Sequence, residues 1–99
     1  MRLEFEWDAI KARLNRKRHG ISFAEAKTVF NDPLLVTFSD DAHSDDEERF
    51  ISIGLSGFSK VLLVVHTEHE IMDDLVSVRI ISCRKATASE RRTYEEGKS

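Results

Sequence analysis

The chain has 99 residues, of which 40% are hydrophobic and 33% are charged, and its formal net charge is -3. This length predicts a single domain over residues 1–99 with one hydrophobic core. A lone cysteine, Cys83, excludes an internal disulfide and a cysteine-based zinc cluster. No apolar run approaches the length of a membrane span and the start is too polar for a signal peptide, so we expect a cytoplasmic protein with no membrane partner.

The charge is unevenly placed along the chain. Residues 1–20 carry a net charge of +3, residues 21–75 carry -9 and residues 76–99 carry +3. If the two basic ends meet in space, an acidic protein can still present a positive cleft to a polyanion. The alternative is an ordinary mixed and solvated surface.

The first predicted elements are a short strand and a basic helix. Apolar residues at every second position from 3 to 7 indicate a half-buried strand. Asp8 is a suitable N-cap for a helix that ends at Gly20, and Ile10 and Leu14 form its predicted buried face. The last turn holds four basic residues, which either suit the helix dipole or bind phosphate: Arg16, Lys17, Arg18 and His19.

A second helix is predicted to follow at once. Ser22 and Glu25 have the spacing of a capping box, which starts it. The Asn31-Asp32-Pro33 segment ends it, because proline lacks an amide hydrogen and disfavours the α region in the residue before it. Its apolar face consists of three residues: Phe23, Ala26 and Phe30.

The second half of the chain predicts strands over residues 34–38, 49–55, 60–67 and 76–86. Residues 68–74 are expected to connect the last two strands. A capping box formed by Thr87 and Glu90 then starts a final helix.

Residues 39–48 form a segment with six carboxylates and His43. The segment lacks the central glycine and the spaced Asp or Asn register of an EF-hand, so we interpret it as an acidic, solvated loop. His66 and His69 lack the spacing of a helical zinc motif, and we expect them to be structural or exposed. The sequence therefore predicts no metal and no cofactor.

The predicted order is β-α-α-β-β-β-β-α, which indicates an α+β fold. The expected sheet has four or five strands, is mainly antiparallel and carries the first two helices on one face. The predicted contacts come from both helices and from the last strand beneath them: Ile10, Leu14, Phe23, Ala26 and Phe30 above Val76, Val78 and Ile80.

Two arginines in the last strand determine what its open face can do. Simple alternation puts Arg79, Ile81 and Cys83 on the side opposite Ile80. Arg79 and Arg84 are an odd number of residues apart, so they share a face only if a bulge or the strand's end intervenes. A guanidinium is costly to bury unpaired, so each must meet an acidic partner, solvent or a ligand.

Three ordered blocks of residues carry a resemblance to a known family that covers nearly the whole chain. The blocks are Phe5-x-Trp7-Asp8-x-x-Lys11-x-x-x-Asn15-x-x-x-His19-Gly20-Ile21-x-Phe23-x-Glu25-Ala26, Glu48-Arg49-x-x-x-x-Gly54, and Arg79-Ile80-Ile81-Ser82-x-Arg84-Lys85-Ala86 with Glu90-Arg91-x-x-Tyr94. This pattern resembles the BrnT family of type II toxins. The resemblance implies a RelE-like fold, a ribonuclease activity that blocks translation, and neutralisation by a ribbon-helix-helix antitoxin, BrnA.

RNA cleavage without a metal needs a base for the 2′-hydroxyl, cations for the phosphorane and an acid for the leaving 5′-oxygen. On this basis we assign the base to Glu48, which stands beside Arg49 where a strand is predicted to begin. Arg79 and Arg84 are assigned to the phosphate, with Arg49 third, because a guanidinium fork matches phosphate oxygens.

Further candidates for the site are Lys11 and His19, as acid or phosphate contact, and Tyr94, which could stack on a base. Trp7 is expected mainly in the core. In the alternative interpretation, Glu48 only neutralises an arginine. The protein would then be a non-catalytic RelE-like module that binds a partner protein.

The resemblance and the charge distribution together predict a tight complex with a BrnA-like ribbon-helix-helix antitoxin. We expect this complex to bury at least roughly 1,000 Å². Surfaces of opposite sign favour specificity and fast association. We expect operator DNA to be bound by the antitoxin's dimeric ribbon and not by this chain.

Overall fold

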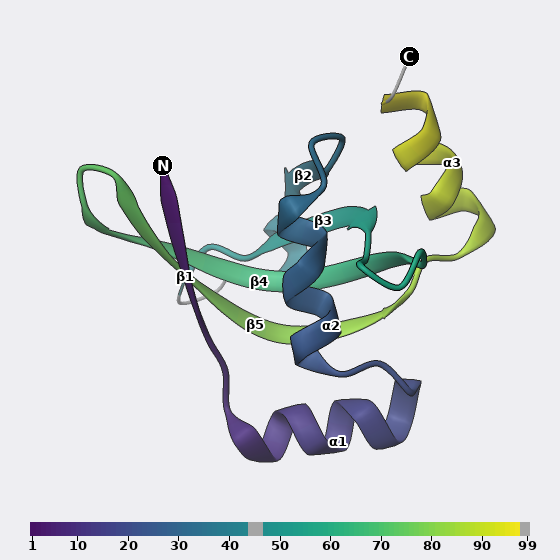
Figure 1. Ribbon diagram of the computed structural model, residues 1–99, viewed down its shortest axis with the longest axis horizontal. Coiled ribbons are helices and arrows are strands. Elements are labelled where there is room, and N and C mark those ends of the chain that lie inside the picture. The colour runs from purple at the N-terminus through teal and green to yellow at the C-terminus, as the bar shows by residue number, and fades with distance from the viewer. Residues whose placement is uncertain (44–46, 98–99) are drawn as a thin grey trace.

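The computed structural model describes residues 1–43 and 47–97. The elements follow the predicted order, with two additional short 3-10 helices, as Figure 1 shows. They are β1 (Arg2–Glu6), α1 (Ala9–His19), α2 (Phe23–Thr28), η1 (Val29–Asn31), β2 (Val36–Ser39), η2 (Asp41–His43), β3 (Phe50–Leu55), β4 (Val61–Met72), β5 (Leu75–Lys85) and α3 (Ala88–Gly97). Within the described ranges, no helix is long and apolar enough to cross a membrane.

The five strands form one sheet in the order β1-β5-β4-β3-β2. The strands from β2 to β5 pair with one another in antiparallel fashion, whereas β1 pairs in parallel with the first half of β5. The prediction of a mainly antiparallel α+β sheet is confirmed. The prediction that residues 68–74 connect two strands is wrong, because β4 continues to Met72 and pairs with β5 up to a turn at Asp73 and Asp74.

Two apolar clusters lie on opposite faces of the sheet. The face that we call the helix face is covered by α2 and η1, whose Phe23, Ala26 and Val29 pack on Ile80 and Cys83 of β5. The predicted burial of Phe23, Ala26, Val78 and Ile80 is confirmed, while Phe30 and Val76 are half-buried. The opposite face holds a smaller cluster, in which Tyr94 of α3 packs with Ile53 and Leu63.

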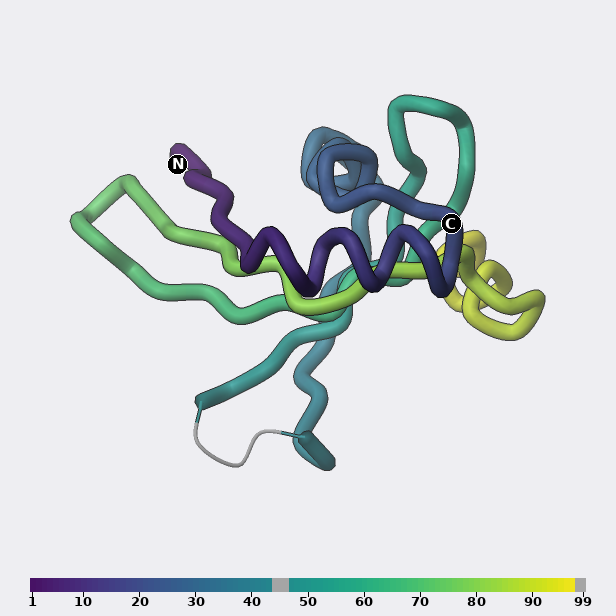
Figure 2. The backbone as a smooth tube through the Cα atoms, turned by 90° about the horizontal axis from the view of Figure 1, so that it is seen from below, coloured from purple at the N-terminus to yellow at the C-terminus, as the bar shows by residue number. Residues whose placement is uncertain are grey.

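α1 lies along the outer edge of β5 and does not cover the sheet with α2, as Figures 1 and 2 show. The predicted burial of Ile10 and Leu14 is therefore wrong, since these residues are 60% and 61% exposed. The only buried residue of the helix is Asn15. β1 ends opposite Arg79, so α1 occupies the edge of β5 that β1 leaves uncovered.

The helix ends follow the predicted local chemistry. The side chain of Asp8 accepts hydrogen bonds from the amides of Ile10 and Lys11, and Gly20 ends α1 with a φ of 74°. The capping box of α3 is reciprocal: the Thr87 hydroxyl accepts from the Glu90 amide at 3.2 Å, and a Glu90 carboxylate oxygen accepts from the Thr87 amide at 2.8 Å. These contacts fix where each helix starts relative to the sheet.

Candidate functional site

A bulge in β5 determines which side chains share a face. Val65 of β4 pairs with Ser82 and His66 pairs with Ile80, so Ile81 has no partner in the ladder. The extra residue reverses the alternation, which puts Cys83 on the helix face with Ile80. The prediction that Cys83 lies on the side of Arg79 is therefore wrong.

The same bulge brings Arg79 and Arg84 to one face of the sheet. Arg79 pairs with Thr67 and Arg84 pairs with Leu63, which belongs to the apolar cluster opposite the helix face. We call this side the arginine face. Arg79 and Arg84 are an odd number of residues apart, and they share a face because the bulge lies between them in the strand.

Arg84 meets an acidic partner at the start of α3. Its Nη1 and Nη2 donate to the two carboxylate oxygens of Glu90 at 2.7 and 2.9 Å. Hydrogen bonds from Arg84 lower the pKa of Glu90 to about 2. The side chain of Arg84 remains 37% exposed, so this fork is held in place and still reaches solvent.

Arg79 is exposed in the middle of β5 and pairs with Glu6 of β1 in the parallel ladder. A hydrogen bond from the Lys11 amide lowers the pKa of Asp8, and the charge of Arg79 adds to the effect. Arg79 therefore lies near the start of α1. Within residues 1–43 and 47–97 its side chain makes no hydrogen bond and no ion pair, and the residue is exposed, so its guanidinium meets solvent.

A pocket of about 290 Å³ opens between α1 and the bulge of β5. Ile81 and Ser82 of its wall lie between the two arginines along the strand. The wall from α1 includes Lys11, Leu14, Asn15, Arg18 and His19. The helix dipole accounts for cations in the last turn, but it gives no reason for a lysine in the first.

Arg18 and Ser82 belong to this pocket. From the sequence, Arg18 is named only among the basic residues of the last turn, and Ser82 is not selected. Helical spacing could have identified Arg18, since Lys11, Leu14 and Arg18 occur at i, i+3 and i+7 and therefore share a face. The position of Ser82 follows from the bulge, which the sequence does not specify.

Glu48 does not join the two arginines. Its Oε2 accepts a 3.4 Å hydrogen bond from Ser39, which pairs with Phe50 in the β2–β3 ladder. Burial raises the pKa of Glu68, and the charge of Glu48 adds to this effect, so the two carboxylates are neighbours. Glu68 pairs with Val78, a residue of the helix face. The register thus places Glu48 with Ser39 and Glu68, on the side of the helix face and away from the arginine face.

Arg49 lies one residue before β3, where its carbonyl accepts from the amide of Asp40 at 2.8 Å. Extending the β3–β4 register by one residue puts Arg49 opposite Thr67, which pairs with Arg79. Arg49 thus falls in the same row of the sheet as Arg79. Its selection as the third arginine stays a prediction.

Tyr94 is 3% exposed. Its hydroxyl donates to a carboxylate oxygen of Asp32 at 2.6 Å, and burial raises its pKa to about 12. A base cannot stack on a ring enclosed in this way. Trp7 is 37% exposed and packs edge-on against Phe23, with ring centroids 6.0 Å apart.

The histidines outside α1 are held by neighbouring side chains. His66 is buried and within 2.7 Å of the Ser52 hydroxyl, while His43 and His69 contact Asp40 and Glu47. Among the described residues no group of three His, Cys, Asp or Glu side chains could hold a metal. Part of the acidic loop, including Asp45 and Asp46, lies outside the described residues.

Comparison with known proteins identifies a family and a related fold. Residues 7–90 match the family described as "Ribonuclease toxin, BrnT, of type II toxin-antitoxin system". The 1.1 Å crystal structure of the Brucella abortus ribonuclease toxin BrnT is similar, with a TM-score of 0.58 and 20% sequence identity. That similarity covers 87% of this chain and 99% of the Brucella chain, and at this identity it supports the fold. No curated protein sequence matches the chain.

Proposed function

The chain belongs to the BrnT family of ribonuclease toxins of type II toxin-antitoxin systems, and from this premise we propose that its arginine face cleaves RNA. In this proposal the protein is a metal-independent endoribonuclease that inhibits translation in the cytoplasm. The observation that carries the assignment is the bulge at Ile81. It puts Arg79 and Arg84 on one face and opens the basic pocket of α1 between them.

The two arginines would hold the phosphate that is cleaved. In-line attack by a 2′-hydroxyl places extra negative charge on the phosphorane oxygens, and fixed guanidinium groups stabilise that charge. Arg84 is pre-organised by its two hydrogen bonds to Glu90, so it loses little freedom when it binds a phosphate. Arg79 has its donors exposed to solvent and would gain the most from a new anionic partner.

Proton transfer is assigned to His19 at the pocket, with Lys11 as a further phosphate contact. An imidazole can accept and donate a proton near neutral pH, which suits both the base and the acid of this reaction. His19 lines the same pocket as Ser82, and Ser82 lies between Arg79 and Arg84 in the sequence. Glu48 becomes the second candidate for the base, because the register sets it beside Glu68 and away from the arginine face.

The antitoxin is proposed to be a ribbon-helix-helix protein of the BrnA type that covers the arginine face. Three apolar residues of that face are left partly exposed: Phe38, Ile51 and Val65. Apolar residues on the same face as the exposed Arg79 suit a protein partner that combines hydrophobic and acidic contacts. Operator binding is assigned to the antitoxin and not to this chain.

A non-catalytic interaction module is the competing function. The ion pair between Arg84 and Glu90 favours it, because one arginine already has an internal partner. The exposure of Arg79 favours the enzyme, because within the described part of the chain no ion pair occupies its guanidinium, which is left to bind a ligand.

Incubation of the purified chain with a defined RNA, with and without EDTA, tests the proposed function. We expect cleavage that survives the chelator. Loss of all cleavage in EDTA would instead indicate a metal enzyme. Absence of cleavage under every condition, together with tight binding of the antitoxin, would favour the interaction module.

A further inference from the structure

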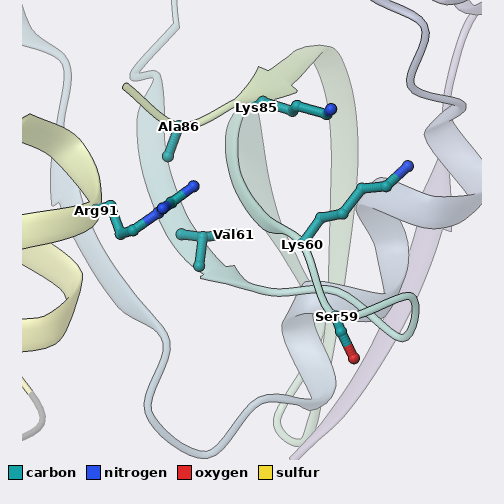
Figure 3. A pocket seen from close by; sticks show the side chains of 6 residues that line it. All are labelled: Ser59, Lys60, Val61, Lys85, Ala86 and Arg91. Carbon is teal, nitrogen blue, oxygen red and sulfur yellow. The ribbon is translucent and has the colours of Figure 1, made fainter. Parts of the chain in front are cut away.

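A second basic pocket lies where the turn between β3 and β4 meets the start of α3. Its volume is about 410 Å³. Six residues line it, three of them cationic, and Figure 3 shows them: Ser59, Lys60, Val61, Lys85, Ala86 and Arg91. This lining shares no residue with the pocket between α1 and β5.

The charge in this pocket is of one sign. In Figure 3 the side chains of Lys60 and Lys85 extend toward the same side, and that of Arg91 reaches toward the space between Ala86 and Val61. No carboxylate is among the lining residues. The Nζ of Lys60 is 3.9 Å from a Glu25 carboxylate that is itself almost buried, and within the described ranges Lys85 and Arg91 form no ion pair.

Lys60 is positioned by a hydrogen-bonded turn. The Ser56 amide donates to the carbonyl of Lys60 at 2.8 Å, and the Lys60 amide donates to the Ser56 hydroxyl at 3.3 Å. That hydroxyl in turn donates to Glu25 of α2 at 2.9 Å. The backbone that carries this cation is thus fixed to the body of the protein.

The other two cations also stand on fixed backbone. Lys85 is the last residue of β5 and pairs with Leu62. The amide of Arg91 donates to the Thr87 carbonyl at 2.8 Å in a helix whose start is fixed by the capping box and by Arg84. The positive end of the helix dipole disfavours an arginine near a helix start, so helix stability does not explain Arg91.

We propose that Lys60, Lys85 and Arg91 bind the RNA backbone beyond the phosphate that is cleaved. This inference rests on the proposed ribonuclease function. Lys85 directly follows Arg84 and pairs with Leu62 of the helix face, so its side chain lies on the other face of β5 and the pocket is reached around the end of the same strand. A strand of RNA held at Arg84 can continue over the end of the sheet into the pocket. The site binds charge and carries no base specificity.

An acidic segment of a partner protein is the other polyanion that such a pocket could hold. The proximity to Arg84 favours RNA, because one continuous backbone can then occupy both sites. Ammonium and guanidinium groups both bind phosphate oxygens, so the three cations of the pocket suit a phosphate backbone.

The test measures binding of an uncleavable 2′-O-methyl RNA oligonucleotide over a series of salt concentrations. The variant is K85Q/R91Q, because neither cation has an ion-pair partner whose loss would weaken the fold. We expect about tenfold weaker binding and a fall of about 0.7 in the salt-dependence slope for each phosphate that the variant no longer neutralises. The matched control is R92Q, one residue further along α3 and outside the pocket, which should change neither quantity. K60Q, checked for an unchanged melting temperature, should weaken binding in the same direction.

Cleavage of unmodified RNA separates this inference from the proposed function. We expect K85Q/R91Q to raise KM about tenfold and to leave kcat unchanged. Normal KM and normal salt dependence in a variant that still cleaves RNA would overturn the pocket assignment alone. A wild-type chain that neither binds nor cleaves RNA would overturn both. Weaker binding of the antitoxin by the variant with unchanged RNA binding would assign the pocket to the protein partner and contradict the proposal.

Discussion

The side-chain amide of Asn15 takes the place of a neighbouring strand at the edge of β5. Its Nδ2 donates to the carbonyl of Cys83 at 3.0 Å, and its Oδ1 accepts from the amide of Cys83 at 3.1 Å. The two residues are 68 positions apart in the sequence. This pair holds α1 against the bulge and thereby sets Lys11 and His19 beside Ser82.

Replacing Asn15 with alanine should destabilise the fold by about 1–3 kcal/mol. The substitution leaves the amide and carbonyl of Cys83 unpaired at a buried position. Chemical denaturation measures the change, with L14A as the control because Leu14 is exposed and should change stability by less than about 0.5 kcal/mol. Equal stability of N15A and L14A would show that the side-chain pair does not hold α1.

Stability should fall as the pH drops from about 6.5 to about 4, because of His66. Burial lowers the pKa of this imidazole from 6.5 to about 4. In this interval the unfolded chain takes up a proton that the folded chain excludes, so folding becomes less favourable by up to about 3 kcal/mol. Urea unfolding at several pH values should show this slope in the wild type and a flatter profile in H66Q. An imidazole that titrates near pH 6.5 in the folded protein by NMR would contradict this account.

Replacing Glu90 with glutamine should lower stability at pH 7 by about 1 kcal/mol, since the change weakens both the fork to Arg84 and the start of α3. The contribution of Glu90 is complete above its ordinary pKa of 4.5 and is lost as the pH falls toward about 2. The difference between wild type and E90Q should therefore disappear near pH 2. E95Q, on the exposed side of the same helix, is the control. A difference that persists unchanged at pH 2 would argue against the ion pair.

The proton-transfer step distinguishes His19 from Glu48. We expect H19Q to lower kcat by about 10²- to 10³-fold and to remove a limb of the pH–rate profile. E48Q should retain most of its activity, because Glu48 lies with Ser39 and Glu68. The opposite pattern, with an inactive E48Q and an active H19Q, would restore Glu48 as the base. Melting temperatures of both variants verify that they are folded.

Local signals in the sequence were sufficient for the caps and the order of the elements. Asp8, Gly20 and the Thr87–Glu90 pair act within a few residues of themselves, so their spacing predicts their geometry. The buried face of α1 was predicted wrongly. Ile10 and Leu14 were expected to be buried because they are apolar, but both are exposed. A polar residue beside that apolar face, Asn15, in fact holds the helix to the edge of the sheet.

The composition of the site depended on tertiary structure that the sequence does not encode locally. The arginine spacing allowed a shared face only with a bulge, and the register between β4 and β5 determines that the bulge falls at Ile81. The choice of Glu48 relied on its place beside Arg49, but adjacent residues in extended chain point to opposite faces. Tyr94 lies in a polar helix, so the sequence indicates an exposed aromatic residue. Its contact with Asp32 forms only when α3 packs on the sheet.

The most direct test of the account is the RNA cleavage rate of R79A beside that of R13A, both measured in EDTA. Arg79 lies on the arginine face without an ion-pair partner in the described residues, whereas Arg13 lines a different pocket on α1 beside Trp7. We predict that R79A keeps the wild-type melting temperature and cleaves about 10²- to 10³-fold more slowly, while R13A cleaves at the wild-type rate. Wild-type cleavage by folded R79A would contradict the assignment of the active site to this face.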